Sequence, residues 1–142
     1  MMNKKTLVVD NSVVMSWLFE DEVSAYADDI LDQLPDLNLL VPAIWSLEVS
    51  NVLLVAEKRG RLSNEDIYQF VNLLMQLPIE VVVEDYRRSM QRILSLGRSN
   101  EISAYDAAYL DLAIQNVCPL ATLDHKLNKA AKRCGVPLFP VS

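Results

Sequence analysis

Four carboxylates stand where an α/β fold would bring them to one edge of a sheet. Asp10 ends an apolar run at residues 7–9, Asp124 follows another at 120–122, and Glu48 and Asp106 lie in segments with helical periodicity. Ionised acids held close together repel strongly, so a proton or a cation must neutralise part of such a group. If these four side chains meet, the sequence predicts a site for a divalent metal ion.

The other residues that carry chemistry restrict that site to oxygen ligands. His125 is the single histidine, and Cys118 and Cys134 lack the spacing of a zinc or redox site. Carboxylate oxygens without sulfur or imidazole suit Mg²⁺ or Mn²⁺. The chain also lacks the glycine-rich phosphate loops and the serine-hydrolase elbow, which leaves the acids as the main candidates.

Apolar runs and helical patterns alternate along the chain. The runs expected to form strands are 6–9, 39–41, 79–83, 120–122 and, as an edge strand between prolines, 138–139. The helices expected between them cover 13–19, 25–34, 44–59, 63–76, 85–96, 104–116 and 126–134, with Ser12, Ser24 and Ser63 as N-caps and Gly60, Gly97 and Gly135 at C-terminal ends. This order predicts an α/β fold: a single doubly wound domain with a mainly parallel sheet of four to five strands, flanked by helices.

A parallel sheet would bring these acids close together. Ligands of open parallel sheets bind beyond the carboxyl ends of the strands, where Asp10 and Asp124 both fall. Ser12 and Thr122 are short polar neighbours able to hold a carboxylate in place. Each acid also has an ordinary structural explanation: a turn residue for Asp10, a paired core acid for Glu48, and helix-terminal acids for Asp106 and Asp124.

Glu48 is the least ordinary of the four acids. On a helix beginning near residue 44, three- and four-residue spacing places it on one face with Ile44, Leu47, Asn51, Val52 and Val55. We therefore expect a carboxylate and a carboxamide to interrupt a buried apolar stripe. A buried acid needs a partner or a ligand, which favours a functional role.

Length and composition indicate one domain over residues 1–142. With 142 residues, of which 51% are apolar, one sizeable core forms more readily than two. No apolar stretch approaches the roughly 20 residues of a membrane helix, and the start of the sequence shows no cleavage signal. We expect a cytoplasmic protein.

The net charge of −6 argues against an ordinary nucleic-acid-binding protein, because phosphate contacts need an excess of lysine and arginine. The basic residues are nevertheless clustered, at Lys58, Arg59 and Arg61; at Arg87, Arg88 and Arg92; at Arg98; and at Lys126, Lys129, Lys132 and Arg133. Any one cluster is also compatible with a solvated helix face. The path of a nucleic acid therefore stays open.

The residues that carry this pattern resemble those of a PIN domain, and in particular the VapC-type toxins of bacterial toxin–antitoxin pairs. The matching motifs are Val8-Val9-Asp10-Asn11-Ser12, Glu48-Val49-Ser50-Asn51, Ser103-Ala104-Tyr105-Asp106-Ala107-Ala108-Tyr109-Leu110 and Leu120-Ala121-Thr122-Leu123-Asp124. The order, spacing and combination of these motifs carry the resemblance. The match covers essentially the whole chain.

The resemblance implies a Mg²⁺- or Mn²⁺-dependent endoribonuclease that acts on RNA, is inhibited by a small antitoxin protein and is often a homodimer. Its catalytic and metal-binding set would be Asp10, Glu48, Asp106 and Asp124, with Ser12, Asn51 and Thr122 in support. From the ligand chemistry we expect the three aspartates to bind the metal directly. Glu48 would bind it or orient the attacking water.

Three other functions are weighed against this one. A phosphoacceptor receiver domain would also place Asp10 and Thr122 at strand ends, but no lysine follows the last apolar run. A haloacid-dehalogenase-type phosphatase needs a second aspartate where the chain has Ser12. A PIN fold that only binds a partner is the third alternative, because a fold does not fix a function.

Overall fold

A four-stranded parallel sheet forms the centre of the molecule. The computed structural model describes residues 4–140. The strands are β1 (Lys5–Val9), β2 (Leu37–Pro42), β3 (Ile79–Val82) and β4 (Leu120–Ala121), and they lie in the order β3-β2-β1-β4. The order of the strands reverses between β1 and β4. The predicted α/β class and parallel sheet are confirmed.

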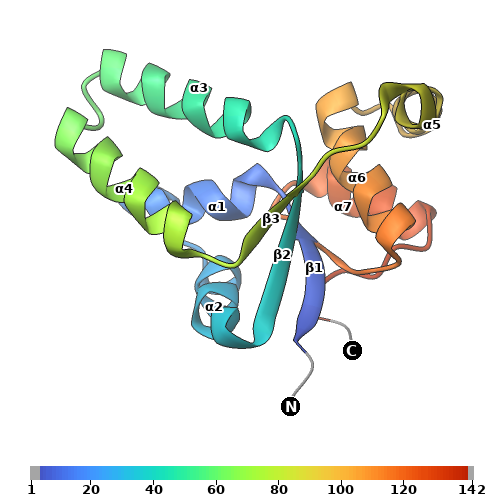
Figure 1. The fold of residues 1–142 in the computed structure, drawn as a ribbon, viewed down its shortest axis with the longest axis horizontal. Helices are drawn as coiled ribbons and strands as arrows, with labels where there is room; N and C mark the ends of the chain where they lie inside the picture. Colours follow the sequence, from blue (N-terminus) through green and yellow to red (C-terminus); the bar gives the residue numbers. More distant parts are fainter. Residues whose placement is uncertain (1–3, 141–142) are drawn as a thin grey trace.

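Helices cover both faces of this sheet. They are α1 (Asn11–Leu18), α2 (Ala25–Gln33), α3 (Trp45–Lys58), α4 (Asn64–Gln76), α5 (Tyr86–Asn100), α6 (Ala104–Asn116) and α7 (His125–Arg133), with short 3₁₀ turns η1 (Glu20–Glu22) and η2 (Leu34–Asp36). Figure 1 shows α1 to α4 on one side of the sheet and α5 to α7 on the other, with α3 and α4 forming a projecting hairpin. Among residues 4–140 no helix is long and apolar enough to span a bilayer.

The strand sequences explain why the sheet is covered on both faces. Leu7, Val8 and Val9 are fully buried, as are Leu39 and Val41 on β2. Such unbroken apolar runs are typical of parallel strands with helices on either side, because successive side chains point to opposite faces. The central strands therefore hold the edge of the sheet that follows Val9 in a fixed position.

Most of the predicted helix ends are confirmed. Ser24 caps α2, and Ser63 caps α4 in a reciprocal capping box with Asp66. Gly60 and Gly135 adopt left-handed φ angles of 74° and 73° after α3 and α7, a conformation that costs glycine little because it has no Cβ.

Two predicted helix ends are wrong. Asp10, rather than Ser12, is the N-cap of α1, because its carboxylate accepts from the Ser12 backbone. Helix α5 does not stop at Gly97 but continues to Asn100. A Cβ at Gly97 would lie 3.2 Å from the carbonyl oxygen of Ile102, so glycine serves there for close approach of the following chain rather than for a left-handed turn.

The predicted fifth strand at residues 138–139 does not form in the described structure. Leu138 makes only an isolated parallel bridge to Leu120, supported by a hydrogen bond from the Phe139 backbone N–H to the Leu120 carbonyl at 2.9 Å. The flanking prolines, Pro137 and Pro140, have no N–H to extend a ladder. The sheet therefore ends at β4, which itself contains two residues.

Candidate active site

Asp10 lies at the carboxyl end of β1, where the strand order reverses. Its side chain is 5% exposed. One carboxylate oxygen, Oδ1, accepts from the Ser12 backbone N–H at 3.1 Å and from the Ser12 hydroxyl at 2.5 Å. The other, Oδ2, accepts from the Thr122 hydroxyl at 2.5 Å. Burial raises the pKa of Asp10 to about 6, although these hydrogen bonds act in the opposite direction.

The two hydroxyls also fix the loop that follows β4. Ser12 Oγ accepts from the backbone N–H of Leu123 at 2.9 Å, and Thr122 Oγ1 accepts from the backbone N–H of Asp124 at 3.0 Å. Each hydroxyl therefore donates to Asp10 and accepts from the chain that carries Asp124. This network joins the ends of β1 and β4, and the structure places Ser12 and Thr122 in contact with Asp10.

Asp124 is the N-cap of α7. Its Oδ1 accepts from the backbone N–H groups of Lys126 and Leu127 at 2.8 and 3.3 Å, so the ordinary structural explanation for this acid holds. Across residues 4–140, no donor contacts its Oδ2. One oxygen can therefore cap the helix while the second remains available to a ligand.

Glu48 contacts α6 through Tyr109, a residue of the motif at 103–110 to which no separate role was assigned. The hydroxyl of Tyr109, a residue that is 1% exposed, donates to Glu48 Oε1 at 2.5 Å. Burial raises the pKa of Glu48 and the negative charge of Asp106 adds to this, while the Tyr109 hydrogen bond lowers it. The sequence signal was the i, i+3 spacing that places Tyr109 beside Asp106 on one face of α6.

Asp106 interacts electrostatically with two of the other acids, Glu48 and Asp124. It is half-buried in the first turn of α6, where Ser103 caps the helix by accepting from the Asp106 N–H at 3.1 Å. Burial raises its pKa and the charge of Asp124 adds to the increase, whereas Ser103 and Lys126 lower it. The charge of Asp106 therefore raises the pKa of Glu48, and the charge of Asp124 raises the pKa of Asp106. These acids lie in one region at the carboxyl edge of the sheet.

Asn51 lies one turn after Glu48 on α3, and its supporting role stays a prediction. It is exposed on α3, and no hydrogen bond involves its side chain in the described residues. The prediction that Glu48 interrupts a buried stripe is wrong, since Leu47 on the same stripe is 72% exposed. The buried side of α3 carries Trp45, Val49, Leu53 and Ala56. Apolar residues lie on both sides of this helix, so periodicity alone could not choose the buried face.

One predicted basic cluster is partly neutralised. Arg92 donates from Nε to Asp111 Oδ1 at 3.0 Å and from a terminal nitrogen to Glu84 Oε2 at 2.7 Å. Asp111 is buried on α6, and no role was predicted for this acid. Its partner explains its burial without a ligand, and Arg92 is committed to this ion pair rather than free for an anion.

The carboxylate set fits a hard divalent cation by the chemistry of its donors. Oxygen ligands alone, with free lone pairs on Asp124 and raised pKa values at Asp10, Glu48 and Asp106, favour a cation that would neutralise them. Across residues 4–140 no three acidic, histidine or cysteine side chains are close enough to share an ion as they stand. Mg²⁺ keeps several waters and is commonly held by one or two carboxylates, which suits this spacing.

Replacing Tyr109 with phenylalanine should lower the free energy of unfolding by about 1.5–3 kcal/mol, the usual contribution of a hydrogen bond to a charged group. The change removes the donor to Glu48 Oε1 and keeps the buried ring. Urea denaturation at neutral pH would measure the loss. Tyr105→Phe, on an exposed position of the same helix, is the matched control, and an equal effect of both changes would contradict the assigned contact.

Comparison with known proteins agrees with this geometry. The sequence profile of the PIN domain matches residues 7–133. Ribonuclease VapC3 from Pyrobaculum aerophilum is 29% identical over 121 residues, which cover 85% of this chain and 91% of that protein.

Two solved structures share the fold. The crystal structure of PAE2754 from Pyrobaculum aerophilum superposes with a TM-score of 0.66 at 18% identity, over 89% of this chain and 79% of that one. The FitAcB structure from Neisseria gonorrhoeae gives 0.63 at 21% identity, over 94% and 96%. With its profile match, its parallel sheet and its acids at the reversal of strand order, the chain belongs to the PIN domain family.

Proposed function

We propose that residues 1–142 act as a single nuclease domain, a metal-dependent endoribonuclease that hydrolyses RNA phosphodiester bonds and is the toxin of a toxin–antitoxin pair. The observation that carries this proposal is the buried carboxylate of Asp10 at the β1/β4 edge, which two hydroxyl groups hold and which Thr122 links to the backbone of Asp124. Similarity to ribonuclease VapC3 supports the reaction and the substrate class.

The proposed site residues would have two roles, to hold a cation and to position a water molecule. Asp10, Asp106 and Asp124 would hold Mg²⁺ or Mn²⁺, and Ser12 and Thr122 would keep Asp10 oriented. A bound ion would supply positive charge against the phosphate oxygens and make a water easier to deprotonate. Glu48, whose Oε1 is fixed by Tyr109, would bind the ion or accept a hydrogen bond from the attacking water.

A cleavage assay tests this function directly. Purified protein is incubated with a mixed RNA pool and Mg²⁺ or Mn²⁺, and the products are sequenced at their ends. We expect cleavage that EDTA stops and that Asp10→Asn removes, while Asp29→Asn, on the exposed side of α2, leaves it unchanged. Cleavage that persists in EDTA would contradict the metal site, and no cleavage under any condition would favour a PIN fold that only binds a partner.

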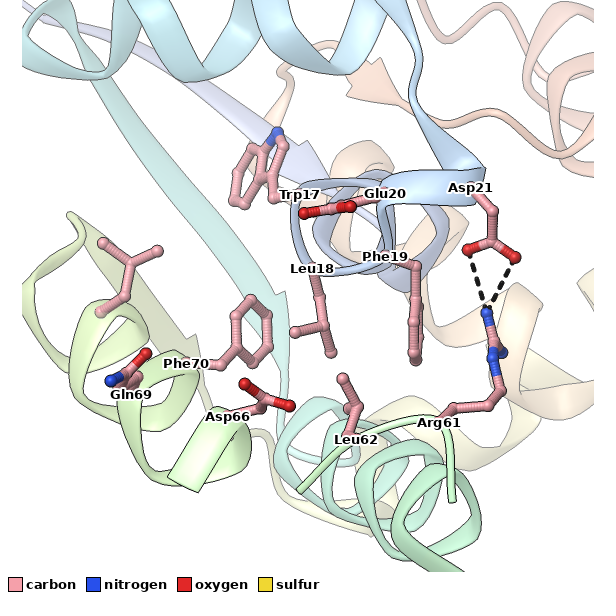
Figure 2. Close-up of a pocket in the computed structure, with 11 residues that line it drawn as sticks. Trp17, Leu18, Phe19, Glu20, Asp21, Arg61, Leu62, Asp66, Gln69 and Phe70 are labelled. Carbon is pink, nitrogen blue, oxygen red and sulfur yellow. Dashed lines mark hydrogen bonds and ion pairs between the residues drawn. The ribbon is translucent and has the colours of Figure 1, made fainter. Parts of the chain in front are cut away.

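A groove beside α1 fits the proposed antitoxin. A cavity of about 600 Å³ lies between the end of α1 and α4, lined by Trp17, Phe19, Leu62 and Phe70 among others. Figure 2 shows Arg61 paired with Asp21 at its side. None of the four site acids lines it. A groove lined by both apolar and charged side chains can take an amphipathic segment of a small protein, and we assign the antitoxin to it.

Self-association is the other partner proposal. Tyr86, Met90 and Leu94 are exposed on α5 at four-residue spacing, so they form one apolar stripe. Exposed stripes of this kind mark interaction surfaces, and we assign a homodimer interface to this one. Size-exclusion chromatography with light scattering should show a dimer that Met90→Asp with Leu94→Asp converts to monomer. A wild-type protein that is monomeric at micromolar concentration would contradict the homodimer.

A further inference from the structure

The charges of this chain are divided sharply at Asp124. All 19 acidic residues lie at or before that position, and none follows it. Helix α7 begins with the next residue and carries four of the 13 lysines and arginines within nine residues. In a chain with a net charge of −6, α7 is therefore a concentrated positive segment.

The cations of α7 are presented on its outer side. Leu127, Ala130 and Ala131 are fully buried and form the face of α7 that packs into the core. Lys126, Lys129, Lys132 and Arg133 are all exposed. At 100° per residue, Lys126, Lys129 and Arg133 fall within one sector of the helix, a stripe that spans about 10 Å along its axis.

No carboxylate of residues 4–140 forms an ion pair with this stripe. Within the described residues, none of the four α7 cations forms an ion pair. Arg133 donates to Asn100 Oδ1 at 2.9 Å and to the Asn100 carbonyl at 3.4 Å. These partners are uncharged, so they hold the guanidinium in place and leave its charge available. By contrast, Arg61 and Arg92 in the other basic clusters are paired with Asp21, Glu84 and Asp111.

The stripe begins at the candidate active site. Asp124 caps α7 and the next two residues are His125 and Lys126. The backbone N–H of Lys126 donates to Asp124 Oδ1 at 2.8 Å, so this lysine lies next to a site acid. An acidic cluster repels a phosphate chain, so a polyanion that enters it needs positive charge close by. Helix α7 provides that charge at the edge of the cluster.

We propose that the outer face of α7, through Lys126, Lys129, Lys132 and Arg133, binds the phosphates of the RNA strand on one side of the scissile bond. The inference rests on the proposed ribonuclease function and assigns the path of its substrate. RNA fits better than an acidic protein segment, because α7 begins directly at the proposed cleavage site. An RNA strand bound at that site would place its next phosphates along α7. The contacts would be to the backbone and would carry no sequence preference.

The test uses a pair of lysines beyond the immediate neighbourhood of the site acids. Lys129→Gln with Lys132→Gln is compared with Lys4→Gln with Lys5→Gln, which removes the same charge at the opposite end of β1. Both pairs are placed in an Asp10→Asn background. Binding of a fluorescein-labelled, random-sequence 20-nucleotide RNA with Mg²⁺ is followed by anisotropy at several salt concentrations. A labelled poly-glutamate is the second probe.

We expect the α7 pair to weaken RNA binding about tenfold near physiological salt and to reduce the slope of log affinity against log salt by roughly 1.4, the value for two lost phosphate contacts on a single strand. The Lys4 and Lys5 pair should change neither quantity. With Asp10 intact, the α7 pair should raise KM for RNA and leave kcat within about twofold, because the chemistry is untouched.

The outcomes separate this inference from the proposed function. Wild-type protein that cleaves RNA, with an α7 pair that matches the Lys4 and Lys5 pair in binding and KM, overturns the α7 path alone. A loss confined to poly-glutamate also overturns it, in favour of an acidic protein partner. Wild-type protein that neither cleaves nor binds RNA overturns both. Unchanged circular dichroism and melting temperature would show that the exposed substitutions left the fold intact.

Discussion

Asp10→Asn should eliminate RNA cleavage and yet make the metal-free protein more stable than the wild type at neutral and alkaline pH. The carboxylate is buried, and burial raises its pKa from 3.8 to about 6. Ionising it in the folded protein therefore costs about 3 kcal/mol relative to the unfolded chain, at 1.36 kcal/mol per pKa unit. Asparagine carries no charge, so this cost disappears.

The pH dependence follows from which state holds the proton more tightly. Between the unfolded value of 3.8 and the folded value of about 6, the folded protein binds more protons than the unfolded one. The stability of the metal-free wild type is therefore highest below this window and falls as pH rises through it. The variant lacks this dependence, so the two proteins should converge in acid and differ above about pH 6.

Thermal denaturation in EDTA at about pH 4 and about pH 8 would measure the difference. Asparagine can still accept from Ser12 through its Oδ1, but its amide nitrogen cannot accept the hydrogen bond from Thr122. The loss of that hydrogen bond offsets part of the gain in stability. Cleavage should fall by more than the roughly 10- to 100-fold that the loss of a supporting contact causes. A variant less stable than the wild type at alkaline pH would show that Asp10 is held favourably as an anion without a metal.

Magnesium should stabilise the wild type at neutral pH and lose affinity steeply in acid. A cation that binds only the folded state adds about 2.7 kcal/mol of stability at 100 times its dissociation constant. Binding must displace the proton of Asp10 below about pH 6. With one proton released per ion, the apparent affinity falls about tenfold for each pH unit below that value.

Magnesium titrations followed by melting temperature, at about pH 5, 6 and 7.5, would check this dependence. The same titration of Asp10→Asn should give little stabilisation, while Asp29→Asn should behave as the wild type does. In Mg²⁺ the order of stability should reverse, with the wild type above Asp10→Asn. An affinity independent of pH over this range would mean that Asp10 does not exchange a proton for the metal.

The sequence predicted those parts of the fold that depend on local chemistry. Mainly apolar runs identified all four strands. Ser24, Ser63 and Gly60 marked helix ends, because capping and left-handed turns need only their own residue and its near neighbours. Gly97 was misread for the opposite reason. Its role depends on Ile102, whose carbonyl approaches it only after the chain has turned back.

For the site, the sequence by itself determined the oxygen-only chemistry of the candidate ligands and the edge of the sheet at which Asp10 and Asp124 lie, since both follow from residue type and parallel topology. The sequence also predicted that Ser12 and Thr122 support a carboxylate, and both contact Asp10. Only the tertiary structure decided the longer-range neighbours: it placed Tyr109 on Glu48, exposed Asn51 and Leu47, and paired Asp111 with Arg92. Local patterns do not contain these contacts, because they depend on which face of each helix packs against the sheet.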